Sequence, residues 1–456
     1  MFSKKTYKNR RRELMKLMKH GIVVFPGHLE SPRNYRANPY SFRQNSNFLY
    51  FWGHSLPGLV GLIDLDDENE ILFGDDFTID DIIWMGDQPK IQELAEFIGI
   101  KKTGSLNEFS EIIQKAIAEG RRVHFLPPCR VEQTLSLSRW LGISPNSVGH
   151  YVSRELIESV IALREIKNNE EITEIETALD YSWAMYDLVL KNLKPGISEQ
   201  DLVGIMEGYL LNRGSQTSFP TILTVHGETL HNHDHSHLLK AGQMVLIDSG
   251  AESPRFYASD ITRTFPVDGQ FSQQQKEIYQ IVLDAQSESI RQAKPGIMYR
   301  DVHLAAARVM VEGLKNLGLM RGDSEEAVQA GAHALFFPHG LGHMLGLDVH
   351  DMEDLGEDYV GYTKKVTRSD QFGLAYLRMA RKLKEGFVVT CEPGIYFIPK
   401  LIDLWMSEKK YEDYINYEAL APYCDFGGIR IEDDLLMTAK GNRVLGKPIP
   451  KDFGLN

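Results

Sequence analysis

Cysteine is scarce in this chain of 456 residues, which contains only Cys129, Cys391 and Cys424. They are odd in number, lie far apart and form no Cys-x-x-Cys spacing, which argues against a disulfide framework and against a thiolate zinc site. Long apolar runs are lacking too. After the basic N-terminal stretch only residues 22–25 are continuously apolar, too few for a signal-peptide core, and no window could span a bilayer. We therefore expect a cytoplasmic protein that does not enter a membrane.

Positive charge is in the minority. The chain has 50 Lys and Arg residues against 63 Asp and Glu residues, which gives a formal net charge of −13. This balance provides no overall attraction to nucleic acid. The basic residues between Lys4 and Lys19 are typical of the solvated face of a helix rather than of a targeting signal. The sequence therefore predicts no nucleic-acid partner.

The composition that remains is that of an ordinary globular protein, with 43% hydrophobic and 25% charged residues and enough length for two packed domains. Helical periodicity over residues 7–20 is followed by strand-like runs at 22–25, 48–52, 59–63, 70–73 and 123–126. Ser105 and Glu108 form a capping box for a helix that reaches about Glu119. This pattern predicts an α/β N-terminal domain over residues 1–155.

The remainder, residues 156–456, has a different pattern. Long amphipathic segments alternate with apolar strands, which favours an α+β domain with antiparallel pairing. The expected helices are 153–163, 170–193, 198–213, 272–293 and 300–317, and the expected strands are 244–247, 388–391 and 429–437. The polar segment 352–370 is expected to be a surface insertion.

Two acids stand out in this second half. Asp248 ends the apolar run 244–247, and Asp260 lies farther along within the segment 257–264. A buried carboxylate is costly unless it is paired with a cation or a metal. Each acid taken alone, however, is more typical of a turn at the end of a strand.

A glycine-rich segment carries three histidines, His339, His343 and His350. The first two are spaced like a helical zinc pair, but glycines weaken the helix and no Glu comes directly after His339, so a zincin motif is rejected. A single such histidine would be an ordinary core or surface residue. Three together with bulky apolar neighbours favour a site.

Two glutamates complete the set. Glu392 precedes a Pro-Gly pair, and Glu432 lies in the expected strand 429–437, whose alternation places it on one face with Arg430 and Asp434. Two Asp, two Glu and one His make a hard, oxygen-rich ligand set that suits Mn²⁺, or Co²⁺, Fe²⁺ or Zn²⁺ by substitution. A bridged pair of divalent ions would account for so many carboxylates.

These residues, in this order and in these local motifs, resemble the five metal ligands of the pita-bread metallopeptidases, specifically of the aminopeptidase P and prolidase family. Residues 42–53 resemble the N-terminal domain of that family, so the similarity spans nearly the whole chain. The resemblance implies a pita-bread catalytic domain in which Asp248 chelates one ion, Asp260 and Glu432 bridge both, and His343 and Glu392 hold the other. It implies hydrolysis of the bond between an N-terminal residue and a following proline.

The resemblance also implies roles around the metals. Glu392 matches a proton shuttle, and His231, His339 and His350 match histidines that position substrate and steady the tetrahedral intermediate. Tyr396 and Arg430 match supporting positions at the substrate site. His226, His233, His235 and His237 match nothing in the family and are expected to be loop residues.

Substrate length is left open between an Xaa-Pro aminopeptidase and an Xaa-Pro dipeptidase. The segments 377–383 and 394–398 look more like prolidase, and Arg378 matches an arginine that receives the carboxylate of a dipeptide. Against this, the chain has one extra residue between Asp248 and Asp260 and a longer polar insertion after Asp351.

The main alternative is a catalytically inactive pita-bread protein that binds peptides or proteins, which retention of the full ligand set disfavours. Creatinase-like hydrolysis needs no metal, and methionine aminopeptidases normally lack such an N-terminal domain. The family relationship further implies a homodimer.

Overall fold

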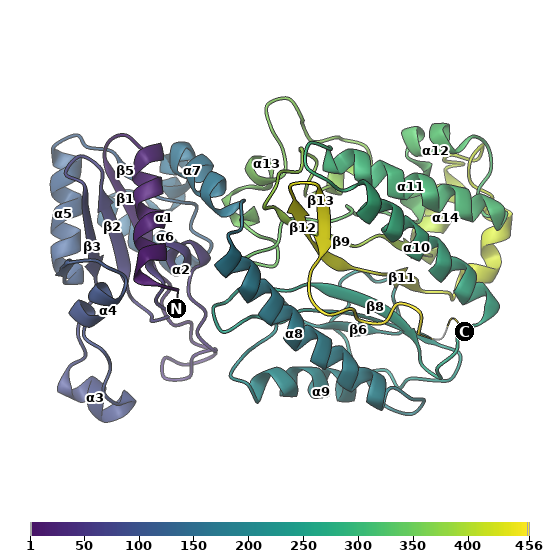
Figure 1. Cartoon of the computed structure of the whole chain (residues 1–456), viewed down its shortest axis with the longest axis horizontal. Helices are drawn as coiled ribbons and strands as arrows, with labels where there is room; N and C mark the ends of the chain where they lie inside the picture. The colour runs from purple at the N-terminus through teal and green to yellow at the C-terminus, as the bar shows by residue number, and fades with distance from the viewer. Residues whose placement is uncertain (1, 454, 456) are drawn as a thin grey trace. The chain divides into compact units, whose positions relative to one another are not determined.

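The computed structural model describes residues 2–453 and 455. The chain folds into two compact units (Figure 1). The first comprises the residues up to Arg164 together with Asp354–Tyr359, and the second comprises Glu165–Glu353 and the chain from Val360 onwards. No helix among the described residues is long and apolar enough to cross a lipid bilayer.

The first unit is built on a mixed five-stranded sheet with the order β4-β3-β2-β1-β5. Its strands are β1 (Ile22–Pro26), β2 (Val60–Asp64), β3 (Asn69–Phe73), β4 (Lys102–Gly104) and β5 (Val123–His124). Its helices are α1 (Lys4–Leu17), α2 (Ser46–Trp52), α3 (Ile79–Met85), α4 (Ile91–Phe97), α5 (Leu106–Ala118), α6 (Val131–Leu141), the 3₁₀ helix η1 (Pro145–Tyr151) and α7 (Arg154–Arg164). The α/β pattern expected for this part is confirmed, and so is the capping box of Ser105 and Glu108 at the start of α5.

One expected strand in this unit is wrong. The run 48–52 belongs to helix α2, whose residues are all buried. The Asn45 side chain accepts hydrogen bonds from the backbone N–H groups of Asn47 and Phe48, and Gly53 ends the helix with a left-handed conformation at φ 71°. A short apolar run is compatible with either structure, and the cap residues on both sides decide for the helix.

Helix α7 belongs entirely to the first unit, although the expected division at residues 155 and 156 falls inside it. Two hydrogen bonds attach its end to α2. The Tyr50 hydroxyl donates to the Leu163 carbonyl oxygen at 2.9 Å, and Arg164 Nη1 donates to Asn47 Oδ1 at 2.6 Å. The chain therefore leaves the first unit only after Arg164.

The second unit contains two long helix pairs and three small sheets. In Figure 1 the pair α8 and α9 and the pair α10 and α11 flank the strands on different sides. Its helices are α8 (Asn169–Asn192), α9 (Glu199–Leu211), α10 (Gln273–Gln292), α11 (Tyr299–Asn316), α12 (Ser324–Ala330), η2 (Ala332–Leu335), η4 (Leu374–Tyr376), α14 (Pro399–Ser407) and η5 (Tyr417–Tyr423). The polar segment 352–370 contains two short helical turns, η3 (Glu353–Leu355) and α13 (Glu357–Val360), most of whose residues belong to the first unit.

The strands of the second unit pair antiparallel, as expected. The sheet orders are β6-β7-β8, β13-β12-β9 and β10-β11. The bounds are β6 (Ile222–Thr224), β7 (Met244–Ser249), β8 (Ile261–Pro266), β9 (Val388–Cys391), β10 (Gly394–Tyr396), β11 (Gly428–Arg430), β12 (Asp433–Thr438) and β13 (Gly441–Val444). Antiparallel sheets flanked by two helix pairs are consistent with the pita-bread architecture that the sequence led us to expect.

The single strand expected over 429–437 is divided in two. Strand β11 pairs with β10, whereas β12 pairs with β9, and Glu432 lies at the junction. The Glu432 N–H donates to the Thr262 carbonyl oxygen at 3.0 Å, which connects the junction to β8. A period-2 pattern cannot reveal this division, because it continues unchanged while the partner strand changes.

A fully buried ion pair supports the loop that carries the histidines. Lys167 Nζ lies 2.7 Å from Asp351 Oδ2, and each side chain is only 1% exposed. The Asp351 N–H donates to the Met344 carbonyl oxygen at 2.9 Å, so the same residue closes the loop 344–351. Removal of one member of a buried pair is costly because the other charge stays buried.

We therefore expect Asp351→Ala to lower the free energy of unfolding by about 3–5 kcal/mol. Asp180→Ala is the matched control, because Asp180 pairs with Lys447 at 3.0 Å on the surface, where the side chains are 52% and 60% exposed. This second change should cost less than about 1 kcal/mol. Urea unfolding in the presence of EDTA measures both, and equal losses would contradict the importance of the buried pair.

Candidate metal centre

The second unit contains a cavity of about 650 Å³ that brings together most of the candidate residues. The lining includes the five expected metal ligands, three expected substrate histidines and two arginines, namely Asp248, Asp260, His343, Glu392, Glu432, His231, His339, His350, Arg378 and Arg430. Tyr396 lies next to them, hydrogen-bonded to His339 and Arg430. Residues that are far apart in the chain thus meet in one cavity.

The β7–β8 hairpin positions the two aspartates. Asp248 lies opposite Thr262 in the ladder, and Ser249 lies opposite Ile261, so Asp260 stands at the start of the returning strand. The isolated bridge between Glu252 and Ala258 continues the same register. The residues between the two aspartates form the tip of the hairpin. This tip accommodates the one extra residue of the segment without disturbing the two acids.

Strand β9 and the loop that carries the histidines position two further candidate ligands, His343 and Glu392. The His343 N–H donates to Thr390 Oγ1 at 3.1 Å, and the Thr390 N–H donates to the His343 carbonyl oxygen at 3.0 Å. Glu392 comes directly after the same strand. His343 and Glu392 are therefore held on neighbouring backbone segments, with His343 Nε2 3.6 Å from Glu392 Oε1.

The ligand atoms converge closely. One donor atom each of Asp260, His343 and Glu432 lies within 4.8 Å of the others, and all three residues are buried. His343 Nε2 is 3.4 Å from Asp260 Oδ2. These distances exceed a hydrogen bond to a ring nitrogen and are compatible with a cation between the groups.

Three of the candidate ligand carboxylates have one oxygen that is buried without a hydrogen-bond partner among the described residues. Arg430 Nη2 donates to Asp248 Oδ2 at 2.6 Å, while Oδ1 has no partner. Thr262 Oγ1 donates to Glu432 Oε2 at 2.6 Å, while Oε1 has none. Asp260 Oδ1 is the third such atom. Buried oxygens without donors are what a divalent cation would satisfy.

The tautomer of His343 fits the same purpose. Its Nδ1 lies 3.0 Å from the Met344 carbonyl oxygen, which can only accept, so Nδ1 carries the proton. Nε2 then presents its lone pair to the acids. An imidazole whose other nitrogen donates to a carbonyl is the usual form of a metal ligand.

The electrostatics show what the arrangement costs without cations. Burial raises the pKa of Asp260 and of Glu432 well above the usual range, and neighbouring carboxylates raise both further. Burial also raises the pKa of Glu392. So much clustered negative charge favours binding of divalent ions.

A chain of hydrogen bonds connects Arg430, Tyr396 and His339. Arg430 Nη1 donates to the Tyr396 hydroxyl at 2.8 Å, and that hydroxyl lies 2.8 Å from His339 Nε2. His339 Nδ1 lies 2.8 Å from the Gly340 carbonyl oxygen, so Nδ1 donates and Nε2 accepts from Tyr396. His339 can therefore contact a substrate only by exchanging one of these bonds.

His350 stacks on His343, with ring centroids 3.8 Å apart and an interplanar angle of 12°. Its Nδ1 lies 2.9 Å from Glu353 Oε2, which also accepts from Arg378 Nη1 at 2.7 Å. Burial lowers the pKa of His350 to about 4 and that of His339 to about 3, so both rings are neutral at neutral pH. The neutral His350 ring donates through Nδ1 and keeps Nε2 as an acceptor.

Several contributors to the site carry little signal in the sequence. Glu353 comes one turn after His350 and lies in a segment that we expected to be a mere insertion. Thr262 and Thr390 orient two ligands, but an isolated threonine in a strand is not distinctive. The buried Asp434, whose Oδ2 accepts from the Asp260 N–H at 3.2 Å, could have been suspected from its place beside Glu432.

The remaining histidines of the loop are distributed differently. His233 lies in a loop, as expected, and also lines the cavity. His226 pairs with Glu228 at 3.1 Å, and His237 pairs with Glu199 at 3.1 Å. These last two belong to local polar pairs rather than to the cavity lining.

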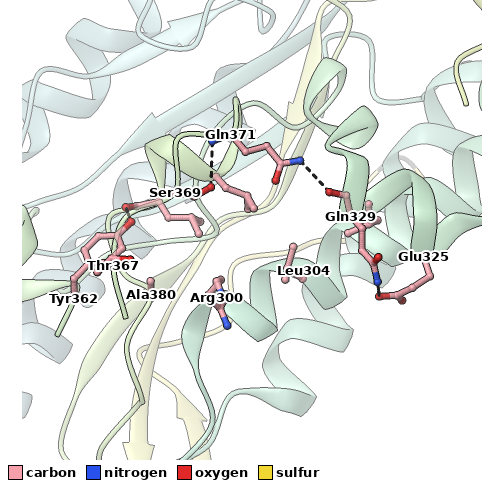
Figure 2. Close-up of a pocket in the computed structure, with 12 residues that line it drawn as sticks. Arg300, Leu304, Glu325, Gln329, Tyr362, Thr367, Ser369, Gln371 and Ala380 are labelled. Carbon is pink, nitrogen blue, oxygen red and sulfur yellow. Dashed lines mark hydrogen bonds between the residues drawn. The ribbon is translucent and has the colours of Figure 1, made fainter. Parts of the chain in front are cut away.

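A second, smaller cavity of about 270 Å³ lies where α11 and α12 meet the segment 362–380 (Figure 2). Gln371 Nε2 donates to the Gln329 carbonyl oxygen at 3.1 Å across it. Leu377 lines this cavity, while its neighbour Arg378 lines the first one. None of the candidate ligands or substrate residues is among its described lining residues.

Comparison with known proteins agrees with this site. Residues 7–124 match the family model "Aminopeptidase P, N-terminal domain", and residues 173–439 match "Metallopeptidase family M24". The human protein named Xaa-Pro dipeptidase is 32% identical over 93% of this chain and 85% of its own length.

Two solved structures cover nearly the whole chain. The aminopeptidase PepP of Pseudomonas aeruginosa superposes with a TM-score of 0.79 at 27% identity, covering 97% of this chain and 94% of that one. A zinc-substituted aminopeptidase P of Escherichia coli in complex with product gives 0.78 at 29% identity, with the same coverage of 97% and 94%. The expected pita-bread fold is thereby confirmed. With its cavity of buried acids and histidines on this fold, the chain belongs to metallopeptidase family M24.

Proposed function

We propose that this chain hydrolyses the peptide bond between an N-terminal residue and a following proline. The observation that carries the proposal is the set of buried carboxylate oxygens without partners around His343 Nε2, inside a cavity large enough for a short peptide. The relatives named Xaa-Pro dipeptidase and aminopeptidase P support the substrate class. Peptides with proline at the second position are therefore the proposed partners.

Two divalent ions are the proposed cofactor, and Mn²⁺ is the proposed metal because hard oxygen donors dominate the set. Asp248, Asp260, His343, Glu392 and Glu432 would hold them. Divalent cations would supply Lewis acidity, which polarises the scissile carbonyl and lowers the pKa of water. Arg430 and Thr262 keep Asp248 and Glu432 oriented for this task.

The chain's own residues would handle the proton and the substrate. Glu392 is proposed as the proton shuttle, and burial raises its pKa. His231 and His350 line the cavity and would contact the peptide, and His339 would act with Tyr396. Arg378 would receive the free carboxylate of a dipeptide, because a guanidinium matches a carboxylate in charge and shape.

Two further proposals rest on less local evidence. None of the described cysteines, Cys129, Cys391 and Cys424, is in a disulfide, which supports a reducing compartment and hence the cytoplasm. A homodimer is proposed from the family relationship.

We expect chelation to abolish activity. Asp260→Ala and Glu432→Ala should lose bound metal as well as turnover, because each removes a carboxylate proposed to bridge both ions. Elemental analysis and an Xaa-Pro hydrolysis assay on the same preparations test this. Full activity in protein without bound metal would sink the proposal, and an intact metal content without any peptidase activity would favour a binding protein instead.

His350→Ala and His339→Ala should lower turnover by about 10² to 10³ while the metal stays bound. The reason is that these side chains are assigned to the substrate and not to coordination. His343→Ala serves as the comparison, since it should lose metal. If His350→Ala or His339→Ala loses metal as severely, its role is misassigned.

Arg378→Ala should raise KM for Xaa-Pro dipeptides about 10-fold or more, and much less for Xaa-Pro-Xaa peptides, whose terminal charge lies farther out. Steady-state kinetics with both substrates under Mn²⁺ provides the measurement. Equal effects on both, or a wild-type preference for the longer peptide, would favour an aminopeptidase that trims peptides one residue at a time.

A further inference from the structure

Glu353 is a largely buried anion at the edge of the cavity, and the proposed reaction chemistry does not use it. Its side chain is 12% exposed, and its Oε2 accepts hydrogen bonds from both Arg378 and His350, at 2.7 and 2.9 Å. These two partners are the residues proposed to meet the carboxyl end and the backbone of a substrate. One carboxylate oxygen therefore connects two substrate-facing groups.

The contact between Glu353 and Arg378 joins the beginning of the polar segment 352–370 to the chain that follows this segment. Glu353 opens η3, directly after the histidine loop, whereas Arg378 lies just beyond η4. The Tyr362 hydroxyl and Arg368 Nη1 both donate to the Leu377 carbonyl oxygen, at 2.6 and 3.1 Å, and hold the backbone next to Arg378. The guanidinium is thus supported from its backbone and through its Nη1 atom.

The charge of Glu353 matters for which substrate Arg378 can accept. Burial raises the pKa of Glu353, but its hydrogen bond with His350 and the nearby positive charges together outweigh burial and lower it, so the carboxyl is ionised at neutral pH. A dipeptide bound with its own carboxylate on Arg378 would bring a second anion next to this one. Like charges at short range inside a cavity disfavour each other.

A longer peptide places an uncharged amide at the same position, where no such repulsion arises. The same Glu353 contact nevertheless keeps Arg378 and His350 in place for either substrate, because both donate to it. Support and discrimination therefore come from a single group.

We propose that Glu353 is a positioning residue that also determines specificity: it orients Arg378 and His350, and its negative charge weakens binding of substrates whose proline ends in a free carboxylate. The proposal rests on the Xaa-Pro activity and on the role of Arg378 proposed above. The chemical class that it disfavours is the free Xaa-Pro dipeptide relative to Xaa-Pro amides and longer peptides.

Glu353→Gln is the decisive variant. The glutamine carbonyl can still accept from Arg378 and His350, but the charge is gone. Xaa-Pro and Xaa-Pro-NH₂ differ only in the terminal carboxylate, so the ratio of their KM values isolates its recognition. We expect the KM ratio of acid to amide to fall about 3- to 10-fold in the variant, on enzyme loaded with Mn²⁺ and checked for metal content.

Two further variants make the result interpretable. Glu385→Gln, which makes the same change of charge at an exposed residue outside the described cavity lining, should leave the KM ratio unchanged. Glu353→Ala, which removes the acceptor, should lower kcat for both substrates about 10-fold or more, since Arg378 and His350 lose their common support.

An unchanged KM ratio in Glu353→Gln, or an equal change in KM for acid and amide, would overturn the proposal. Arg378→Ala with the same two substrates separates the underlying assumptions. If it affects acid and amide equally, Arg378 does not receive the carboxylate, and the specificity role of Glu353, which rests on that contact, is overturned. Wild-type protein that hydrolyses neither substrate would overturn the proposed function, and this inference with it.

Discussion

Carboxylates that are buried beside one another repel, and the second unit is organised around this repulsion. Asp260 and Glu432 have raised pKa values because burial and neighbouring acids disfavour their charge. The neighbouring side chains offset this repulsion only in part. Arg430 and Thr262 each hold one oxygen of an acid, while the opposite oxygens of Asp248 and Glu432 stay buried without partners among the described residues. Divalent cations bound between these carboxylates would relieve the repulsion.

The small sheets explain how this arrangement is maintained. Each acid among the candidate ligands lies at the end of a strand or at a junction between strands. The hydrogen bonds of a sheet fix the backbone on one side of the acid, and the sheet does not constrain the chain on the other side. The break between β11 and β12 is the clearest case, because the Glu432 N–H bonds to β8 instead of continuing a ladder. In a regular strand through this position, the alternation of side chains alone would determine where the Glu432 side chain points.

The sequence predicted which residues meet in the cavity better than it predicted their setting. Asp248, Asp260, His343 and Glu392, which the sequence singled out together as candidate ligands, all line the same cavity. Patterns of apolar residues alone failed in two places, for different reasons. The apolar run at 48–52 is helical because Asn45 and Gly53 cap it, and the run at 429–437 is divided because its two halves pair with different strands. The role of Glu353 was missed because it depends on a contact with Arg378, which lies farther along the chain.

The order of the ligands along the chain has a consequence for folding. Asp248 and Asp260 lie in one hairpin, His343 lies in a later loop, and Glu392 and Glu432 lie among the last strands. The candidate ligands therefore come from segments that are far apart in sequence. Contacts between such distant segments form late in folding, because the entropy cost of closing the long loop between them comes before the contacts stabilise the chain. A nascent or truncated chain would therefore have low affinity for the ions. Metal ions would bind mainly to the completed catalytic unit, and their binding would stabilise it by mass action.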